Sequence, residues 1–407
     1  MRILNIKEEN KTKFERILGS FGATAVSIGG IIGSGIFFII GMAAAEAGPA
    51  VILSLVIAGI IALFTALSFA SLGSKILKEG GEYQFVYVAF GSTVGFFAGL
   101  LWISATAIAG VTVSIAFASY LTALIPIIPV NIAAALACLA FMTIDVVGIH
   151  FSSSVNNILT LTKVGVLLIF ILLCLPFFNA SNFNNFFAKG TEGILSAAFL
   201  IFFAYAGFGK ITAASEEVKN PKKTIPKAII TAIAICTLLY FMSGIASVGV
   251  VGSEKLSSKE FRNAPFAYVM LATGFRWAFL IIAIGAITAT ASVLLIQMLG
   301  ISRTVYAMSK NKQLPSFLCK LHPKFKTPYK AEIILGILMA LAALFLNARS
   351  VIILTSLGIL SYYSIINLAA LVMKRQKGGF EVHSIIPILG FFSSILLIAY
   401  YIWTIFV

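Results

Sequence analysis

The chain has 407 residues, of which 60% are apolar and only 11% carry a charge. Soluble globular proteins carry about 25% charged residues, so this composition excludes an ordinary water-facing surface. The net charge of +15 at pH 7 would suit a nucleic-acid-binding protein, but the charges lie in short clusters between long apolar runs. The composition therefore predicts an integral membrane protein, with the lipid bilayer and no nucleic acid as its partner.

Apolar runs long enough to cross a hydrocarbon core about 30 Å thick follow one another along the chain. The third and eighth runs exceed one crossing length and contain no charged turn, so each is expected to be one tilted helix that extends beyond the bilayer. The pattern predicts an all-α fold with a single transmembrane domain over residues 1–407. We expect about eleven spans, at residues 18–44, 50–73, 84–124, 130–147, 156–177, 193–217, 226–251, 268–308, 331–347, 350–373 and 385–407.

Lysine and arginine are distributed unequally between alternate connections. If the N-terminus lies in the cytoplasm, the inner connections hold 21 of these residues and the outer connections hold six. The positive-inside rule then predicts a multi-pass protein of the plasma membrane with a cytoplasmic N-terminus. Basic clusters on one face also suit anionic lipid better than the phosphates of a nucleic-acid groove.

Glycine clusters weaken two of the expected spans. Residues 28–37 of the first span read IGGIIGSGIF, and residues 202–209 of the sixth read FFAYAGFG. Each glycine inside a helix costs about 1 kcal/mol relative to alanine. In lipid, free backbone groups are tolerated only where they line a cavity or meet a ligand. Close helix packing through Gly29 and Gly33 is the alternative explanation for the first cluster.

The two glycine clusters occupy matching positions in two halves of the chain. They lie five spans apart, and a proline follows each at the same distance: Pro49 is fourteen residues after Gly35, and Pro221 is fourteen after Gly207. Matching interrupted spans predict an inverted-repeat transporter whose site lies at the breaks. The repeats would be spans one to five, about 18–177, and spans six to ten, about 193–373, with 385–407 as an extra span.

Helix ends at the breaks predict which part of a substrate binds where. The amides of residues 34–36 would form an exposed helix N-terminus that accepts a carboxylate. The carbonyls of residues 203–205 would end the facing half of span six and accept an ammonium group. A carboxylate acceptor beside an ammonium acceptor describes an amino acid. The predicted substrate-binding residues are Ile32, Gly33, Ser34, Gly35, Ile36, Phe203, Ala204, Tyr205, Ala206, Gly207 and Phe208.

These segments resemble the amino acid–polyamine–organocation (APC) transporter superfamily. GGIIGSGIF at 29–37, GFGKITAASEEVKNPKKTIPKA at 207–228 and RTVYAMSKNKQLP at 303–315 are similar to its first-span signature, its sixth span with the following inner loop, and its segment after span eight. The resemblance implies the LeuT-type fold, with spans one and six discontinuous and alternating access around a midplane site. Members usually have twelve spans, whereas this chain is expected to have eleven. The family's oligomer interface therefore cannot be assumed for this chain, and no oligomeric state is predicted.

Lys163 lies seven residues into span five, with no acidic residue nearby in sequence. An ionisable residue at such depth is a functional hypothesis, and the alternative is a lysine whose stem reaches the inner surface about 10 Å away. Desolvation favours the neutral amine, so we expect Lys163 to exchange a proton. The resemblance implies a lysine in span five, proton coupling in some members, and partners at carbonyls near Gly29 and Gly30 and at Thr288 and Ser292. Alternatively, Thr288 and Ser292 are ordinary packing residues of a membrane helix and do not bind Lys163.

Span three offers Trp102, Ser104 and Thr106 as pocket candidates and contains no carboxylate in its core. A cationic side chain or a polyamine would require a carboxylate there, so its absence favours neutral substrates. Phe203 and Phe208 are candidates for gates that close over the substrate.

Motifs of other protein classes are missing from the sequence. The four cysteines include no CxxC pair, and neither HExxH nor GxSxG occurs, so we expect no metal site, cofactor or catalytic residue. The GFGK segment that ends at Lys210 lacks the glycine at 204 and the hydroxyl residue at 211 of a phosphate-binding loop. Lys210 is expected either to line the inner vestibule or to reach Glu217 at i+7.

The sequence favours a proton-coupled secondary transporter of neutral amino acids that works by alternating access. Its partners would be the amino acid and a proton. The alternative is an exchanger of amino acids or polyamines without net proton movement, in which Lys163 is a fixed cation. A receptor is disfavoured because the chain has no sizeable soluble domain.

Overall fold

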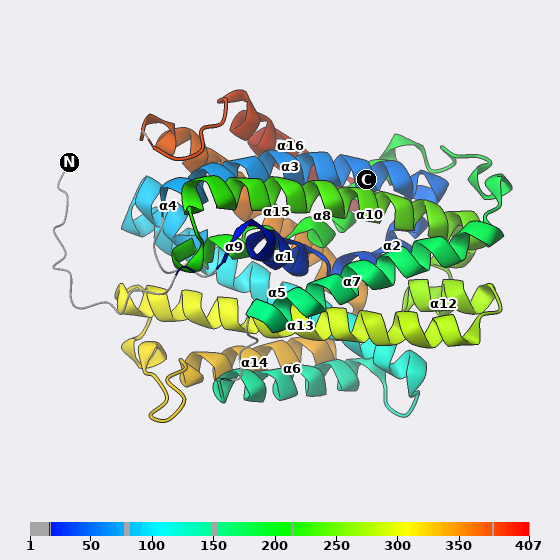
Figure 1. Ribbon diagram of the computed structural model, residues 1–407, viewed down its shortest axis with the longest axis horizontal. Coiled ribbons are helices and arrows are strands. Elements are labelled where there is room, and N and C mark those ends of the chain that lie inside the picture. The colour runs from blue at the N-terminus through cyan, green and yellow to red at the C-terminus, as the bar shows by residue number, and fades with distance from the viewer. Residues whose placement is uncertain are drawn as a thin grey trace.

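The computed structural model describes residues 16, 18–76, 82–148, 153–213, 215–376 and 378–406. Every named element in these residues is a helix, and one β-bridge pairs Leu18 with Val218. The long helices run side by side along the longest axis of the molecule (Figure 1). Large apolar side chains also cover the outside of the bundle; Leu172 is 62% exposed and Leu338 is 58% exposed. Such a surface suits lipid rather than water.

Short 3₁₀ turns and loops join the α-helices. In chain order the helices are α1 (Ser20–Ile31), α2 (Ser34–Ala47), α3 (Val51–Lys75), α4 (Glu82–Phe90), α5 (Ser92–Leu124), α6 (Val130–Val146), α7 (Ser153–Cys174), α8 (Gly190–Tyr205), α9 (Lys210–Ala213), α10 (Pro221–Ser257), α11 (Lys259–Arg262), α12 (Pro265–Ala272), α13 (Arg276–Lys310), α14 (Tyr329–Phe345), α15 (Ala348–Val372) and α16 (Ile385–Phe406).

Length and composition alone qualify eight segments of the described chain as membrane spans. The first of them, Ser20–Lys75, contains α1, α2 and α3 and is therefore longer than one crossing. Helix α6 is apolar but slightly shorter, with 17 residues. Repeated apolar helices of crossing length make this chain a multi-pass membrane protein.

Single glycines divide two runs that were expected to be continuous helices. Gly91, with a φ of 86°, separates α4 from α5, and Gly274, also with a φ of 86°, separates α12 from α13. Glycine adopts this left-handed conformation without the steric penalty of a Cβ atom. The expectation of uninterrupted helices over 84–124 and 268–308 was wrong, because it considered only charged turns as possible breaks.

The broken helices lie in the middle of the bundle. Helices α1 and α2 contact α7, α8 and α10, while α5 packs on α13 and α15. Helices α6 and α14 pack together along one edge of the view in Figure 1, and α16 lies along the opposite edge. The short helices α4 and α9 lie toward the same end of the bundle in Figure 1. This arrangement surrounds the helix breaks with other helices on all sides.

Candidate transport site at the two helix breaks

The first span breaks at the predicted glycine cluster. Helix α1 ends at Ile31 and α2 begins at Ser34, and Gly33 between them has a φ of −152° and a ψ of −135°. A Cβ atom on Gly33 would lie 2.6 Å from Cγ2 of Val293. No side chain caps α2, and the buried hydroxyl of Ser34 has no hydrogen-bond partner among the described residues. Helix α2 thus begins within the predicted segment, and no side chain caps its first amides; that they bind a carboxylate stays a prediction.

The second break lies directly against the first. Helix α8 ends at Tyr205, a turn follows, and α9 begins at Lys210. Gly207 in this turn has a φ of 110°, and a Cβ atom there would overlap the carbonyl oxygen of Gly30. Conversely, a Cβ atom on Gly30 would lie 2.6 Å from the carbonyl oxygen of Gly207. Both glycines are therefore required for backbone contact between the breaks, which lie at one depth.

A tyrosine of α10 joins the ends of the two broken helices. The hydroxyl of Tyr240 lies 3.0 Å from the carbonyl oxygen of Ile31 and 3.1 Å from that of Ala204. The hydroxyl carries one proton, so it donates to one carbonyl at a time. Beside this bridge, Gly35 packs against the backbone of Ala204. Sequence reasoning missed Tyr240, whose only signal was a polar group within the seventh apolar run.

Helix α7 holds α1 through two side chains on one face. Lys163 is 1% exposed, and its Nζ donates to the carbonyl oxygen of Gly29 at 2.8 Å. One turn earlier, the hydroxyl of Thr160 donates to the carbonyl oxygen of Ala25 at 3.1 Å. The end of α1 carries free carbonyls and partial negative charge, which suits an ammonium group. The predicted contact between Lys163 and Gly29 is present in the structure.

The two predicted hydroxyl partners of Lys163 are bonded within their own helix. Thr288 donates to the carbonyl oxygen of Ile284 at 2.9 Å, and Ser292 donates to that of Ala289 at 2.9 Å. The hydrogen bond recorded for Lys163 goes to Gly29 and to neither hydroxyl. A direct role of Thr288 and Ser292 therefore stays a prediction.

Span three contributes an aromatic wall with α15. The ring of Trp102 lies 4.7 Å from that of Tyr362 and 6.4 Å from that of Tyr363, measured between centroids. Thr106, one turn beyond Trp102, is buried, and its hydroxyl lacks a hydrogen-bond partner among the described residues, as do both tyrosine hydroxyls. Ser104 is exposed and lies on another face of α5. Two of the three predicted residues thus face the interior, and Ser104 does not.

The two phenylalanines proposed as gates are both buried. Phe208 meets Phe69 edge to face, with 5.2 Å between ring centroids, and lies 5.4 Å from the ring of Tyr363. Phe203 is 7% exposed, near the end of α8. Phe208 is therefore part of an aromatic cluster that joins the second break to α3 and α15.

A buried acid lies beside the second break. Glu82 of α4 is 6% exposed, and a Cβ atom on Gly209 would lie 2.5 Å from its Oε1. Burial raises the pKa of Glu82 to about 8, and the nearby ammonium of Lys210 partly opposes this rise. The expected i, i+7 relation of Lys210 to Glu217 does not hold, because α9 ends at Ala213. Sequence reasoning missed Glu82, which lies just outside the expected third span.

The known proteins that this chain resembles are permeases and transporters. Residues 18–407 match a family model described as amino acid permease. The branched-chain amino acid permease of Bacillus subtilis is 33% identical over 383 residues, which cover 89% of this chain and 82% of that protein. The methylthioribose transporter of the same organism is 31% identical over 413 residues, covering 96% and 88%. Cationic amino acid transporter 4 of Mus musculus is 28% identical over 396 residues, covering 91% and 61%.

Proposed function

Because this chain belongs to the amino acid permease family of the APC superfamily, we propose that it is a proton-coupled secondary transporter of neutral amino acids. The observation that carries the proposal is the contact between the two broken helices at Gly30 and Gly207. Lys163 is bonded to the carbonyl oxygen of Gly29, directly beside that contact. A helix N-terminus, helix carbonyls and a buried lysine thus come together at one place.

The proposed topology has eleven spans in the LeuT-type arrangement. Spans one to five are α1–α2, α3, α5, α6 and α7, and spans six to ten are α8–α9, α10, α13, α14 and α15, with α16 as the extra span. Support comes from the matching positions of the two breaks in an inverted repeat. The excess of basic residues on one set of connections supports a cytoplasmic N-terminus in the plasma membrane.

The amino acid would lie with its carboxylate at the start of α2 and its ammonium group at the end of α8. The free amides after Gly33 and the unpartnered hydroxyl of Ser34 are donors for the carboxylate. The carbonyl of Tyr205 at the end of α8 is an acceptor for the ammonium group.

A neutral side chain suits the groups around the breaks. Burial favours the protonated form of Glu82, and Lys210 already lies nearby, so Glu82 offers no free negative charge to a cationic substrate. Val293 adds an apolar neighbour at Gly33. The name of the Bacillus subtilis branched-chain amino acid permease agrees with this substrate class.

Lys163 would link protonation to the movement of α1. As an ammonium group it attracts the negative end of α1 through the carbonyl of Gly29. Loss of the proton removes the charge and weakens this attraction. Helix α1 is then released from α7, and one side of the site opens. Proton binding and substrate access would thus be coupled through one hydrogen bond.

Uptake into proteoliposomes tests the proposal. Labelled leucine, arginine, putrescine and methylthioribose are offered with and without an inward proton gradient. The proposal predicts that leucine enters fastest and that the gradient drives its accumulation. Thr162→Ala, which removes an exposed hydroxyl on α7 next to Lys163, serves as the control and should transport normally. Uptake that requires an internal amino acid and ignores the gradient would instead establish an exchanger.

A further inference from the structure

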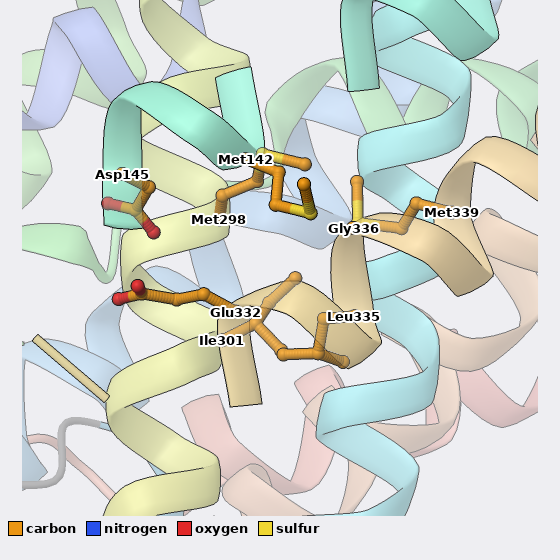
Figure 2. A pocket seen from close by; sticks show the side chains of 8 residues that line it. All are labelled: Met142, Asp145, Met298, Ile301, Glu332, Leu335, Gly336 and Met339. Carbon is orange, nitrogen blue, oxygen red and sulfur yellow. The ribbon is translucent and has the colours of Figure 1, made fainter. Parts of the chain in front are cut away.

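A second buried polar cluster lies where α6, α13 and α14 pack together, away from the helix breaks. Asp145 lies in the last turn of α6 and Glu332 in the first turn of α14, and they are 0% and 3% exposed. Figure 2 shows the two carboxyl groups on the same side of a cavity, one from each helix. The other residues that line this acid cavity are apolar: Met142, Met298, Ile301, Leu335, Gly336 and Met339.

The carboxylates have no hydrogen-bond donor in the described part of the chain. None of their four oxygens has a partner there. The hydroxyls of Ser302 and Thr327 lie beside Glu332, but both are committed to backbone carbonyls. Ser302 donates to Leu299 at 3.0 Å, and Thr327 donates to Val146 at 2.8 Å. Each hydroxyl has one proton, so while it donates to its backbone carbonyl it presents only lone pairs to Glu332.

No basic side chain neutralises the pair either. Arg303 attracts both carboxylates electrostatically, yet its side chain is exposed and forms no ion pair with them in the described residues. Asp145 also lies at the negative end of α6, which makes its charge more costly. Buried carboxyl groups are neutralised by a proton, by an ion pair or by a bound cation. In the absence of an ion pair, a proton or a cation has to neutralise Asp145 and Glu332.

We propose that the acid cavity binds one hard cation of the size of Na⁺ or Ca²⁺, held without its water shell. The space open to the centre of a water-sized sphere is about 10 Å³, which is the order needed for a single occupant of that size. The carboxyl oxygens of Asp145 and Glu332 line the cavity, and the hydroxyls of Ser302 and Thr327 lie beside Glu332; such oxygen atoms are the ligands that Ca²⁺ accepts. Mg²⁺ keeps several waters, for which the cavity has no room.

The cation would stabilise the packing of α6 and α14 on α13. Helices α5 and α13 both contact α6 and α14, and they lie between these helices and the broken ones. The site is therefore spatially separate from Lys163 and from the helix breaks. Its occupation is expected to change the melting temperature of the protein.

Thermal unfolding of the purified full-length protein in detergent tests the site at constant pH and ionic strength. Na⁺ is compared with choline, and Ca²⁺ with Mg²⁺ and with chelator. The proposal predicts a saturable rise of Tm with Na⁺ or Ca²⁺ but with neither Mg²⁺ nor choline. Equilibrium dialysis with radioactive Na⁺ and Ca²⁺ identifies which of the two binds and should give one ion per chain.

Variants of Asp145 and Glu332 provide a second test of the cation site. Asp145→Asn with Glu332→Gln should abolish the cation-dependent rise of Tm. Without added cation, this double variant should melt above the unchanged protein, because two unpaired buried charges are gone. Glu254→Gln, which alters an exposed acid of α10, should keep the full cation response. The proposal is overturned if dialysis finds no bound cation and Tm responds to pH alone, or if the double variant keeps the response. Dialysis of the unchanged protein decides the question even if a variant fails to fold.

Discussion

The helix breaks and the acid cavity are two buried polar regions that neutralise charge in different ways. At the breaks, interrupted helices leave free carbonyls and amides, so Lys163 finds an acceptor at Gly29. In the acid cavity, α6 and α14 are continuous and their inner backbone groups are already bonded, so Asp145 and Glu332 find no donor. A broken helix can thus receive a charged ligand with its own backbone, whereas buried acids on an unbroken helix need a proton or a bound cation to neutralise them.

Removing the charge at the breaks is expected to have the largest effect. Lys163→Met keeps the length of the side chain but removes the hydrogen bond to Gly29. A charge-assisted hydrogen bond contributes about 1.5–3 kcal/mol, so gradient-driven uptake should fall by roughly 10- to 100-fold. Uptake kinetics in proteoliposomes measure this. Normal gradient-driven uptake in the variant would show that Lys163 is only structural.

Disrupting the backbone contact between the two breaks should have the next largest effect. Gly207→Ala places a side chain on a backbone with a φ of 110° and against the carbonyl of Gly30. Left-handed strain costs about 1–2 kcal/mol before the overlap is counted, so both Tm and uptake should fall. Gly300→Ala in α13 is the matched control, because nothing lies within 4 Å of its Cβ position, and its Tm should stay the same or rise. Equal effects of the two substitutions would contradict the required contact.

Loss of the bridge at the breaks should have a moderate effect. Tyr240→Phe removes the hydroxyl between the carbonyls of Ile31 and Ala204. An unsatisfied buried acceptor costs about 1–3 kcal/mol, so the free energy of unfolding should fall by about that amount. Tyr400→Phe, whose hydroxyl has no partner in the described chain, should change stability very little. Denaturant titration of the two variants in mixed micelles measures the difference.

The smallest expected effect concerns the pH dependence of stability at Glu82. Burial raises its pKa from 4.5 to about 8, so the folded protein keeps a proton there that the unfolded chain has already lost. This contribution to stability is complete below about pH 4.5 and is lost as the pH rises toward 8. Tm should therefore fall less between pH 5 and pH 8 in Glu82→Gln than in the unchanged protein. Identical slopes in the two proteins would mean that Glu82 does not titrate in this range.

Local patterns in the sequence predicted the broken helices correctly. Glycine clusters weaken a helix wherever they occur, so α1 ends at Ile31 and α8 ends at Tyr205 within the predicted segments. The membrane helices follow from apolar runs in the same way. A single glycine in such a run is ambiguous, which is why the divisions at Gly91 and Gly274 were not expected.

Contacts between distant parts of the chain could not be predicted. Tyr240 and Ile31 are 209 positions apart, and no motif links them. Asp145 and Glu332 likewise stand in separate apolar helices, and only the packing of α6 on α14 brings them to one cavity. Such pairs depend on how helices pack in three dimensions rather than on spacing along one helix.

In the proposed mechanism, an amino acid and a proton cross the membrane together through the breaks, with Lys163 as the proton carrier. The most direct measurement uses proteoliposomes with a pH-sensitive dye in the lumen and no imposed proton gradient. Addition of external leucine should acidify the lumen with the unchanged protein and leave it unaltered with Lys163→Met. Leucine uptake by the unchanged protein without any change in luminal pH would contradict the claim.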